Sequence, residues 1–517
     1  MDGMTKKLLD GMRKKRAGAM LGGGQKRIDA QHERGKLTAR ERINLLLDEG
    51  SFHEIGMMAT HNLTTFGLDK QRFAGDAVVT GFGKINGRRV AVYSQDFTVL
   101  GGSFSEIQSQ KITRIMDKAL EAGIPCVGLG DSGGARIQEG VRSLAAYGEV
   151  FVRNVESSGV IPQISVILGP CAGGAVYSPA LTDFIIMAGK SYMFLTGPEV
   201  IRSVTGEQVS VDDLGGAGVH MGTSGVAHLS AESEEEGLNM VKKLLSYLPQ
   251  NNNEEPPRIV PEDSIGRMEL SLNSIIPDGP NSPYDMRDVV AAVFDRDSFF
   301  EVQPDYAPNA VVGFARMDGY AVGIIANQPC CMAGALDINS SDKIARHIRI
   351  CDAYNLPIVT FVDCPGFLPG TGQEYGGVIR HGAKVLYAYC EATVPMVSII
   401  TRKSYGGAHL AMNSRQMRAD LAFSWPTGQI AVMGAEGAVN VLYREEIKKA
   451  EDPKKREQEI LEAYREEFLN PYRAADVGQI DEVIEPAETR PRLALALEVL
   501  RTKVAQNPPR KHGLMPV

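Results

Sequence analysis

The sequence has little cysteine and no excess of positive charge. Its 517 residues include only seven cysteines, and no two of them form a Cys-x-x-Cys pair. This pattern excludes a disulfide framework and a zinc ribbon, and we expect buried free thiols in a reducing compartment. The chain holds 55 basic and 63 acidic residues, a formal net charge of −8. Because there is no basic excess to displace counterions, nucleic acid is not an expected partner.

Long apolar runs are also missing. The stretch 157–182 carries no charge, but Pro162, Pro170, Pro179 and several glycines interrupt it. A helix that crosses a membrane needs about 20 consecutive apolar residues, so this stretch is not expected to cross one. The first 20 residues are rich in lysine and arginine and contain no apolar signal core. We therefore expect a cytoplasmic protein.

Glycine, in contrast, is abundant and clustered. The chain has 55 glycines in 517 residues, against a usual share of about 7%. Clusters of this kind suit tight turns and backbone that closely approaches a ligand. One stretch rich in proline and asparagine, 249–257, breaks the chain near its middle. It predicts two domains, 1–255 and 256–517.

An internal repeat supports the same division. Short motifs recur at an offset of 232 or 233 residues, so the two halves are expected to share one fold. The matching pairs are Asn86-Gly87 with Asp318-Gly319, Lys111 with Lys343, Pro125 with Pro357, Asp131 with Asp363, Pro162 with Pro395, and Gly173-Gly174 with Gly406-Gly407.

Each half alternates apolar strand patterns with helical patterns. This alternation predicts an α/β fold with parallel strands and crossover helices, in which ligands bind at the carboxyl ends of the strands. The expected strands are 124–129, 163–168, 358–362 and 396–401, and the expected helices are 105–122, 139–157, 340–354 and 375–392.

The turn around Ser132 is open to several interpretations. It fits the Gly-x-Gly-x-x-Gly dinucleotide pattern, but the next strand does not end in the acidic residue that such a site needs. It also fits the Gly-x-Ser-x-Gly elbow of serine hydrolases, with Asp363, His381 and His409 as candidate partners. The repeat places Cys364 where the serine would recur, which favours a backbone role. A serine hydrolase remains one alternative, and a scaffold without catalytic activity is another.

Two glycine pairs suggest a different kind of site, in which backbone N–H groups hold an oxyanion. Gly173-Gly174 and Gly406-Gly407 each follow an expected strand and open an expected helix. Peptide N–H groups at a helix start point outward, and adjacent donors there can hold a developing oxyanion. One such turn in each half suits a reaction in which two carbonyl oxygens gain negative charge.

Longer motifs around these turns resemble the carboxyltransferase subunits of biotin-dependent acyl-CoA carboxylases. The resemblance extends to the propionyl-CoA carboxylase β subunit, the methylmalonyl-CoA decarboxylase α subunit and the large transcarboxylase subunit, and runs from about residue 22 to the end. The motifs are Asp131-Ser132-Gly133-Gly134-Ala135-Arg136-Ile137-Gln138-Glu139-Gly140, Gly169-Pro170-Cys171-Ala172-Gly173-Gly174-Ala175, Asp363-Cys364-Pro365-Gly366-Phe367 and Tyr405-Gly406-Gly407-Ala408.

The resemblance implies two tandem crotonase-like domains, related by the repeat, in a homohexamer built as a dimer of trimers. It implies transfer of a carboxyl group between carboxybiotin and a short-chain acyl-CoA, propionyl-CoA or methylmalonyl-CoA. By this resemblance, domain 1–255 takes the acyl-CoA and domain 256–517 takes biotin. The implied catalytic residues are Gly173 and Gly174 for the thioester enolate and Gly406 and Gly407 for the ureido oxygen of biotin. The implied cofactor-binding residues are Gly133, Gly134, Ala135, Arg136, Lys343, Ala408 and Leu410.

Missing motifs define the expected partners. The chain has no Met-Lys dipeptide for biotin attachment and no Gly-x-x-x-x-Gly-Lys-[Ser/Thr] nucleotide loop. Biotin is therefore expected on a separate protein, such as a biotin carboxylase or biotin carboxyl carrier subunit, or within a membrane decarboxylase complex. Arg136 and Lys343 are candidate cations for the phosphates of coenzyme A, and no metal is expected. Leu410 stands where many propionyl-CoA carboxylases have aspartate, at a position that the family associates with acyl selectivity.

Overall fold

The computed structural model describes residues 3–279 and 282–517. Contacts divide the chain into two compact units, which we call unit 1 (Met1–Glu255) and unit 2 (Pro256–Val517). The boundary lies inside the stretch 249–257.

Unit 1 is built on one mixed sheet with the strand order β1-β2-β3-β4-β5-β6-β8, and β7 pairs with β5 beyond this path. Strands β1 to β3 are antiparallel, whereas β3, β4, β5, β6 and β8 are parallel. The strands are His53–Ile55, Val78–Ile85, Arg88–Gln95, Cys126–Ser132, Gln163–Ala172, Phe184–Ala188, Tyr192–Phe194 and Leu229–Ala231. The helices α1 to α10 are Gly3–Met20, Gln25–Glu33, Ala39–Leu46, Glu106–Ala122, Val141–Ser157, Tyr177–Ala180, Pro198–Thr205, Val211–Gly215, Ala217–Gly222 and Glu234–Tyr247.

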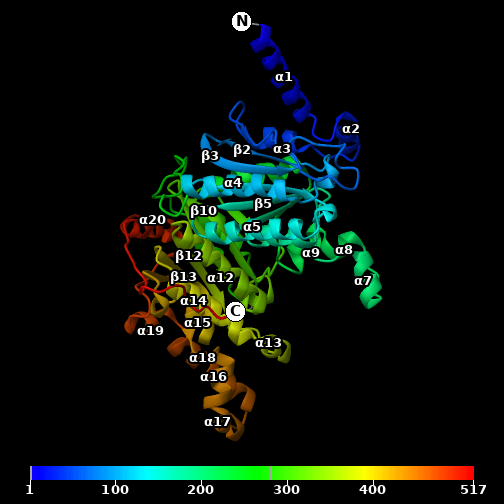
Figure 1. Cartoon of the computed structure of the whole chain (residues 1–517). Coiled ribbons are helices and arrows are strands. Elements are labelled where there is room, and N and C mark those ends of the chain that lie inside the picture. Colours follow the sequence, from blue (N-terminus) through cyan, green and yellow to red (C-terminus); the bar gives the residue numbers. More distant parts are fainter. Residues whose placement is uncertain (1–2, 280–281) are drawn as a thin grey trace. The chain divides into compact units, whose positions relative to one another are not determined.

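Helices cover both faces of this sheet (Figure 1). Successive side chains of a strand point to opposite faces, so neighbours on β5 contact different helices. Ile167 joins the core formed with α4 and α5. Val166 lies on the other face, near Gly237 of α10. This burial on both faces explains the uncharged run of the sequence through β5.

Unit 2 repeats the arrangement with the order β16-β14-β13-β12-β11-β10-β9, and β15 pairs with β13. Strands β9 to β16 are Phe300–Val302, Ala310–Met317, Tyr320–Asn327, Ile358–Cys364, Met396–Tyr405, Leu421–Ser424, Gln429–Ala431 and Glu482–Val483. The helices α11 to α20 are Met286–Val293, Ile338–Ala353, Thr371–Gly376, Val378–Glu391, Gly406–Ala411, Ala435–Leu442, Arg444–Lys449, Pro453–Phe468, Pro471–Asp476 and Thr489–Leu500.

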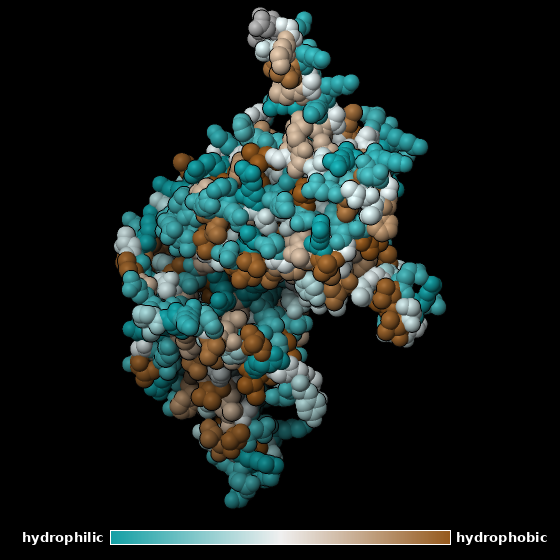
Figure 2. All heavy atoms as spheres, viewed as in Figure 1, coloured by the Kyte–Doolittle hydropathy of each residue, from teal (hydrophilic) through white to brown (hydrophobic). Residues whose placement is uncertain are grey.

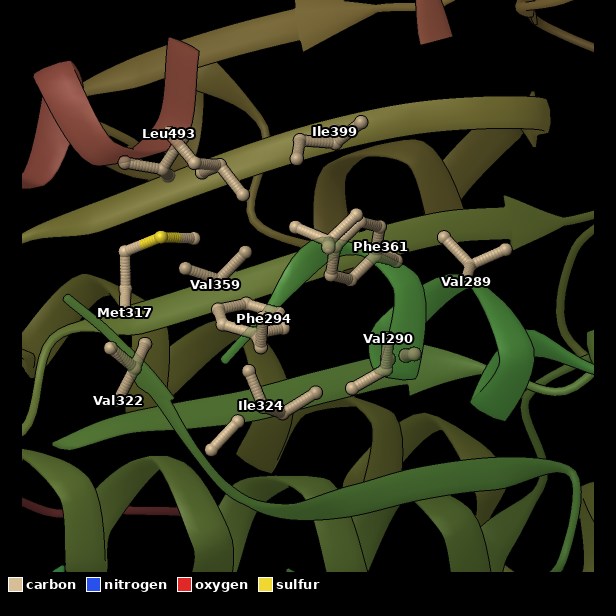
Figure 3. Close-up of a cluster of buried hydrophobic side chains, with 14 of the residues drawn as sticks. Val289, Val290, Phe294, Met317, Val322, Ile324, Val359, Phe361, Ile399 and Leu493 are labelled. Carbon is tan, nitrogen blue, oxygen red and sulfur yellow. The ribbon is translucent and has the colours of Figure 1, made fainter. Parts of the chain in front are cut away.

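The core of unit 2 lies between α11, α20 and one face of the sheet (Figure 3). Val290 and Phe294 from the α11 segment contact Phe361 of β12 and neighbouring strand residues. The rings of Phe294 and Phe361 meet edge to face, with centroids 6.2 Å apart. Leu493 closes this core from α20.

The predicted α/β class and parallel strands are confirmed, and the repeat is visible in both units. The hairpins β2–β3 and β10–β11 turn at Asn86-Gly87 and Asp318-Gly319, where φ is positive at all four residues. Some predicted boundaries are wrong. Strands β5 and β13 continue beyond 168 and 401 up to the glycine pairs, and the helix expected over 375–392 is two helices. Gly377, with φ +89°, separates α13 from α14.

The expectation that all cysteines are buried is wrong for three of them. Cys330 and Cys390 are exposed and Cys331 is partly exposed, whereas the other four are buried. Cys330 and Cys331 lie in the loop that follows β11, and Cys390 lies on the face of α14 that points away from its buried residues.

Candidate active site

The glycine pair of unit 1 lies where β5 ends. Gly173 begins a short 3₁₀ helix, Gly173–Val176, which leads into α6. Its φ is +64°, a left-handed conformation that glycine adopts without strain. The first N–H groups of a helix have no acceptor within the helix and carry its positive end. The backbone at Gly173 and Gly174 is therefore suited to hold an anionic oxygen.

A second turn of unit 1 lies directly beside the first. Strand β4 ends at Ser132, which pairs with Cys171 of β5. Gly134 has φ +103°, and a Cβ atom there would lie 3.3 Å from the carbonyl oxygen of Ala172. The structure thus brings Gly134, with Gly133 and Ala135 on either side of it in the chain, next to Ala172, the residue that precedes Gly173 and Gly174.

Unit 2 presents the equivalent glycine pair at the end of β13. Gly406 has φ +57° and begins α15, and Gly407 follows as its second residue. No atom of the described residues lies within 4 Å of a Cβ added at Gly407, so its surroundings are open. Ala408 is buried beneath the turn, and Leu410 is 41% exposed on the same helix.

A buried aspartate near the end of β4 and another near the end of β12 each form an ion pair with an arginine. These strands precede the turns at Gly133 and Gly366. Asp131 accepts from Arg42 Nη1 at 2.7 Å, and Arg42 also pairs with Glu234 at 2.8 Å. Asp363, its repeat partner, accepts from Arg402 Nε at 2.9 Å. Neither arginine had been singled out in the sequence, where only the recurrence of the aspartates was visible.

Arg136 does not present a cation to solvent. Its side chain is fully buried, and Nη1 pairs with Asp76 at 2.6 Å and with Glu139 at 3.3 Å. Its Nε donates to Ser103 Oγ at 3.2 Å. The guanidinium holds the Gly133–Arg136 turn against unit 1, and this geometry does not favour the phosphate role expected from the sequence.

Lys343 is enclosed in the same way. Its Nζ donates to the carbonyl oxygens of Gln303 and Tyr306 at 2.8 and 2.7 Å, and to that of Ala310 at 2.7 Å. Burial lowers the pKa of Lys343 to about 7. Its repeat partner Lys111 donates to the carbonyls of Gly75 and Val78. Lys111 thus connects α4 to β2, and Lys343 connects α12 to β10, with its ammonium directed at backbone carbonyls.

Ser132 lacks the setting of a nucleophile. It is 1% exposed, its Oγ donates to the carbonyl of Gly102 at 2.8 Å, and it accepts from Gly134 N at 3.2 Å. The histidine His409 instead contacts Ser404 Oγ through Nδ1 at 2.8 Å, and His381 contacts Asp342. The hydroxyl of Ser132 thus supports a turn, and the structure gives no support to the hydrolase interpretation.

Neither a metal-binding group nor a membrane-crossing helix is found within the part of the chain that the structure describes. No cluster of three or more histidine, cysteine, aspartate or glutamate side chains could hold a metal ion among residues 3–279 and 282–517. No helix of these residues is long and apolar enough to cross a membrane.

Each of the two repeated α/β units carries a glycine pair that begins a helix at the end of a central strand, an arrangement suited to an enzyme that stabilises oxyanions. The carboxyl transferase domain model matches residues 30–515. The propionyl-CoA carboxylase carboxyltransferase subunit of Haloferax mediterranei is 56% identical over 510 residues, which cover 98% of this chain and 99% of that protein. The methylmalonyl-CoA decarboxylase subunit alpha of Veillonella parvula is 54% identical over 508 residues, 98% of both chains.

A solved structure agrees with these relatives. A chain of the transcarboxylase 12S crystal structure, a hexamer with methylmalonyl-coenzyme A and methylmalonic acid bound, matches with a TM-score of 0.96 at 52% identity, and the match covers 98% of each chain. The predicted fold of two crotonase-like domains is thereby confirmed. This chain belongs to the carboxyl transferase domain family, in the branch that includes propionyl-CoA carboxylase β and methylmalonyl-CoA decarboxylase α subunits.

Proposed function

We propose that this protein moves a carboxyl group between biotin, carried by a partner protein, and propionyl-CoA or methylmalonyl-CoA. The observation that carries the proposal is the repeated glycine pair at a helix start, Gly173-Gly174 and Gly406-Gly407. Relatives that are more than 50% identical over nearly their whole length are named for these acyl-CoA substrates, which supports the choice of substrate.

The turn of unit 1 would hold the acyl-CoA. When the α-carbon of the thioester loses its proton or its carboxyl group, negative charge moves to the thioester oxygen. The N–H groups of Gly173 and Gly174 would donate to that oxygen, and they bind the enolate more strongly than the neutral thioester. Gly133, Gly134 and Ala135 would also bind the acyl-CoA, since Gly134 lies against Ala172, immediately before the glycine pair.

The turn of unit 2 would hold biotin. The open surroundings of Gly407 and the helix-start donors there suit a ureido oxygen. Biotin bound there would supply the ring nitrogen that carries the carboxyl group. The N–H groups of Gly406 and Gly407 would orient the ureido oxygen and stabilise its negative charge. Leu410, on the same helix α15, is the residue that we propose to influence acyl selectivity.

Exposed apolar side chains support self-assembly, because monomeric proteins rarely expose large apolar patches. Figure 2 shows such side chains on the surface over α7 of unit 1 and over α16 of unit 2. They include Val200, Val204, Val441 and Leu442, each at least 50% exposed. We propose a homohexamer like the transcarboxylase core, with a biotin carboxylase, a biotin carrier subunit or a membrane decarboxylase complex as partner. Capture of the native complex and identification of its subunits would distinguish carboxylase from decarboxylase use.

The test is carboxyl exchange between methylmalonyl-CoA and free biotin, measured on purified protein. Gly407→Val is the sharpest variant, because its side chain enters open space and should abolish exchange without unfolding the protein. Gly174→Val should also abolish exchange. Gly218→Val is the matched control, since Gly218 is likewise the second residue of a short helix with open surroundings. Full exchange by Gly407→Val would remove the proposed role of the turn, whereas a folded wild type that binds coenzyme A without exchange would favour a scaffold.

A further inference from the structure

A continuous stack of aromatic rings links the two glycine turns of unit 1. The rings of Phe104 and Tyr147 are nearly parallel, with centroids 4.1 Å apart and an interplanar angle of 14°. Tyr147 also stacks on Phe151 at 6.0 Å, and Phe151 meets Tyr177 edge to face at 6.1 Å. Tyr177 is the first residue of α6, which directly follows Gly173–Val176. The stack therefore runs from one turn to the other through α5.

Phe104 fixes the first end of this stack to the Gly134 turn. Its N–H donates to the carbonyl of Gly134 at 2.8 Å, and its carbonyl accepts from Arg136 N at 2.9 Å. The hydroxyl of Ser143, on α5, also donates to the carbonyl oxygen of Phe104, at 2.8 Å. Phe104 is 3% exposed, so its ring and its backbone are both held in place.

Tyr147 supports the second turn from below. A Cβ atom added at Gly174 would lie 3.4 Å from the Tyr147 ring, and the three atoms nearest to that position all belong to Tyr147, so the ring faces this side of the Gly174 backbone. A cavity of about 40 Å³, lined by Tyr147, Val150, Ala175 and Ser178 among others, lies beside the ring. Packing beside the ring is therefore already incomplete, and removal of the ring would enlarge the empty space next to Gly174 and Ala175.

The ring of Tyr147, rather than its hydroxyl, makes these contacts. Within the described residues the hydroxyl is buried without a hydrogen bond of ordinary geometry, although it interacts weakly with Ser132. Burial raises the pKa of Tyr147 far above its usual range, so the hydroxyl stays neutral. A phenylalanine would keep every ring contact described above.

We propose that Tyr147 is a positioning residue for carboxyl transfer, whose ring sets the position of the Gly174 N–H group relative to the Gly134 turn. The inference rests on the proposed function. Displacement of an oxyanion donor by about 1 Å can cost 100-fold in rate. Since the donor acts more strongly on the enolate than on the thioester, loss of the ring should lower kcat and leave KM nearly unchanged.

The test compares variants of the full chain in the carboxyl-exchange assay. Tyr147→Leu should lower kcat by 10- to 100-fold, with KM for methylmalonyl-CoA within about threefold of wild type. Tyr147→Phe should restore kcat to within about threefold. Val150→Ala is the matched control, because Val150 lies one turn further along α5, lines the same cavity and is 2% exposed, whereas the three atoms nearest to the Cβ position of Gly174 all belong to Tyr147. It should lower Tm but keep kcat.

Each outcome separates the inference from the proposed function. A folded Tyr147→Leu protein with kcat near wild type, or an equal loss of kcat in Val150→Ala, would overturn the positioning role. If Tyr147→Leu does not fold, Tyr147→Met replaces it with the same expected result, since the unbranched side chain fills more of the space. A wild type without exchange activity would instead remove the proposed function, and the inference would fall with it.

Discussion

Arg42 Nη1 donates to Asp131 Oδ2 at 2.7 Å, and both side chains are at most 3% exposed. Glu234 pairs with the same guanidinium at 2.8 Å. This buried network joins α3, the end of β4 and the start of α10, and so fixes the strand end that carries the Gly133 turn. Removal of one member of a buried ionic network leaves its partners uncompensated, which costs about 3–5 kcal/mol.

We therefore expect Arg42→Met to lower the free energy of unfolding by about 3–5 kcal/mol, measured by urea unfolding. Arg202→Met is the control, because its partner Glu199 is exposed and such surface pairs contribute about 0–1 kcal/mol. Equal stability of the two variants would contradict the importance of the Arg42 network.

Ser132 provides a direct test of the hydrolase alternative. Because its hydroxyl is buried and bonded to the Gly102 carbonyl, a fluorophosphonate probe should not label the folded protein. Ser132→Ala should lose about 1–2 kcal/mol of stability through these hydrogen bonds and still exchange carboxyl groups. Labelling at Ser132, detected by mass spectrometry, together with loss of all activity in Ser132→Ala, would restore the hydrolase interpretation.

Lys343 should contribute strongly to the stability of unit 2. Lys343→Met keeps the length of the side chain but leaves the carbonyls of Gln303, Tyr306 and Ala310 without their donor. Buried acceptors without partners cost about 1–3 kcal/mol each, so we expect a loss of about 3 kcal/mol or more by urea unfolding. Lys448→Met, at an exposed lysine, should change stability little. A loss no greater than that of the control would show that water replaces the ammonium.

The glycine turns were predictable from the sequence, whereas the charged residues around them were not. Gly173 and Gly406 have positive φ, a backbone conformation that favours glycine. The sequence therefore shows a glycine at each of these positions, separated by the offset of the repeat. The partner of Asp131 lies 89 residues away in α3, and no local pattern indicates such a pairing. Arg136 likewise stands in a motif that suggests ligand contact, but its charge is neutralised by Asp76, 60 residues earlier.

Aromatic spacing was a signal that could have been used. Tyr147 and Phe151 are four residues apart, so they share one face of α5 and could be expected to stack. Their contact with Phe104 and Tyr177 depends on how α5 packs on the sheet, which the sequence of the helix does not encode by itself.

His347 should make stability depend on pH. It is 3% exposed, and its Nε2 lies 2.9 Å from the carbonyl of Gly313, so the neutral ring donates there. Burial, with a smaller contribution from the nearby Lys343, lowers the pKa of His347 to about 4, although the hydrogen bond to Gly313 acts in the opposite direction. The unfolded chain therefore takes up a proton near pH 6.5, before the folded chain does. Stability is fully present above pH 6.5 and falls as the pH decreases towards 4, by about 3 kcal/mol in total.

The measurement is urea unfolding of the wild type and of His347→Gln at pH 7, 6 and 5. Glutamine can keep a donor to Gly313 but does not titrate in this range, so the stability difference between the two proteins should shrink by up to about 1.4 kcal/mol for each pH unit below 6.5. Above pH 7 the difference should be constant. Parallel curves over the whole range would show that His347 is already charged, or hydrated, in the folded protein.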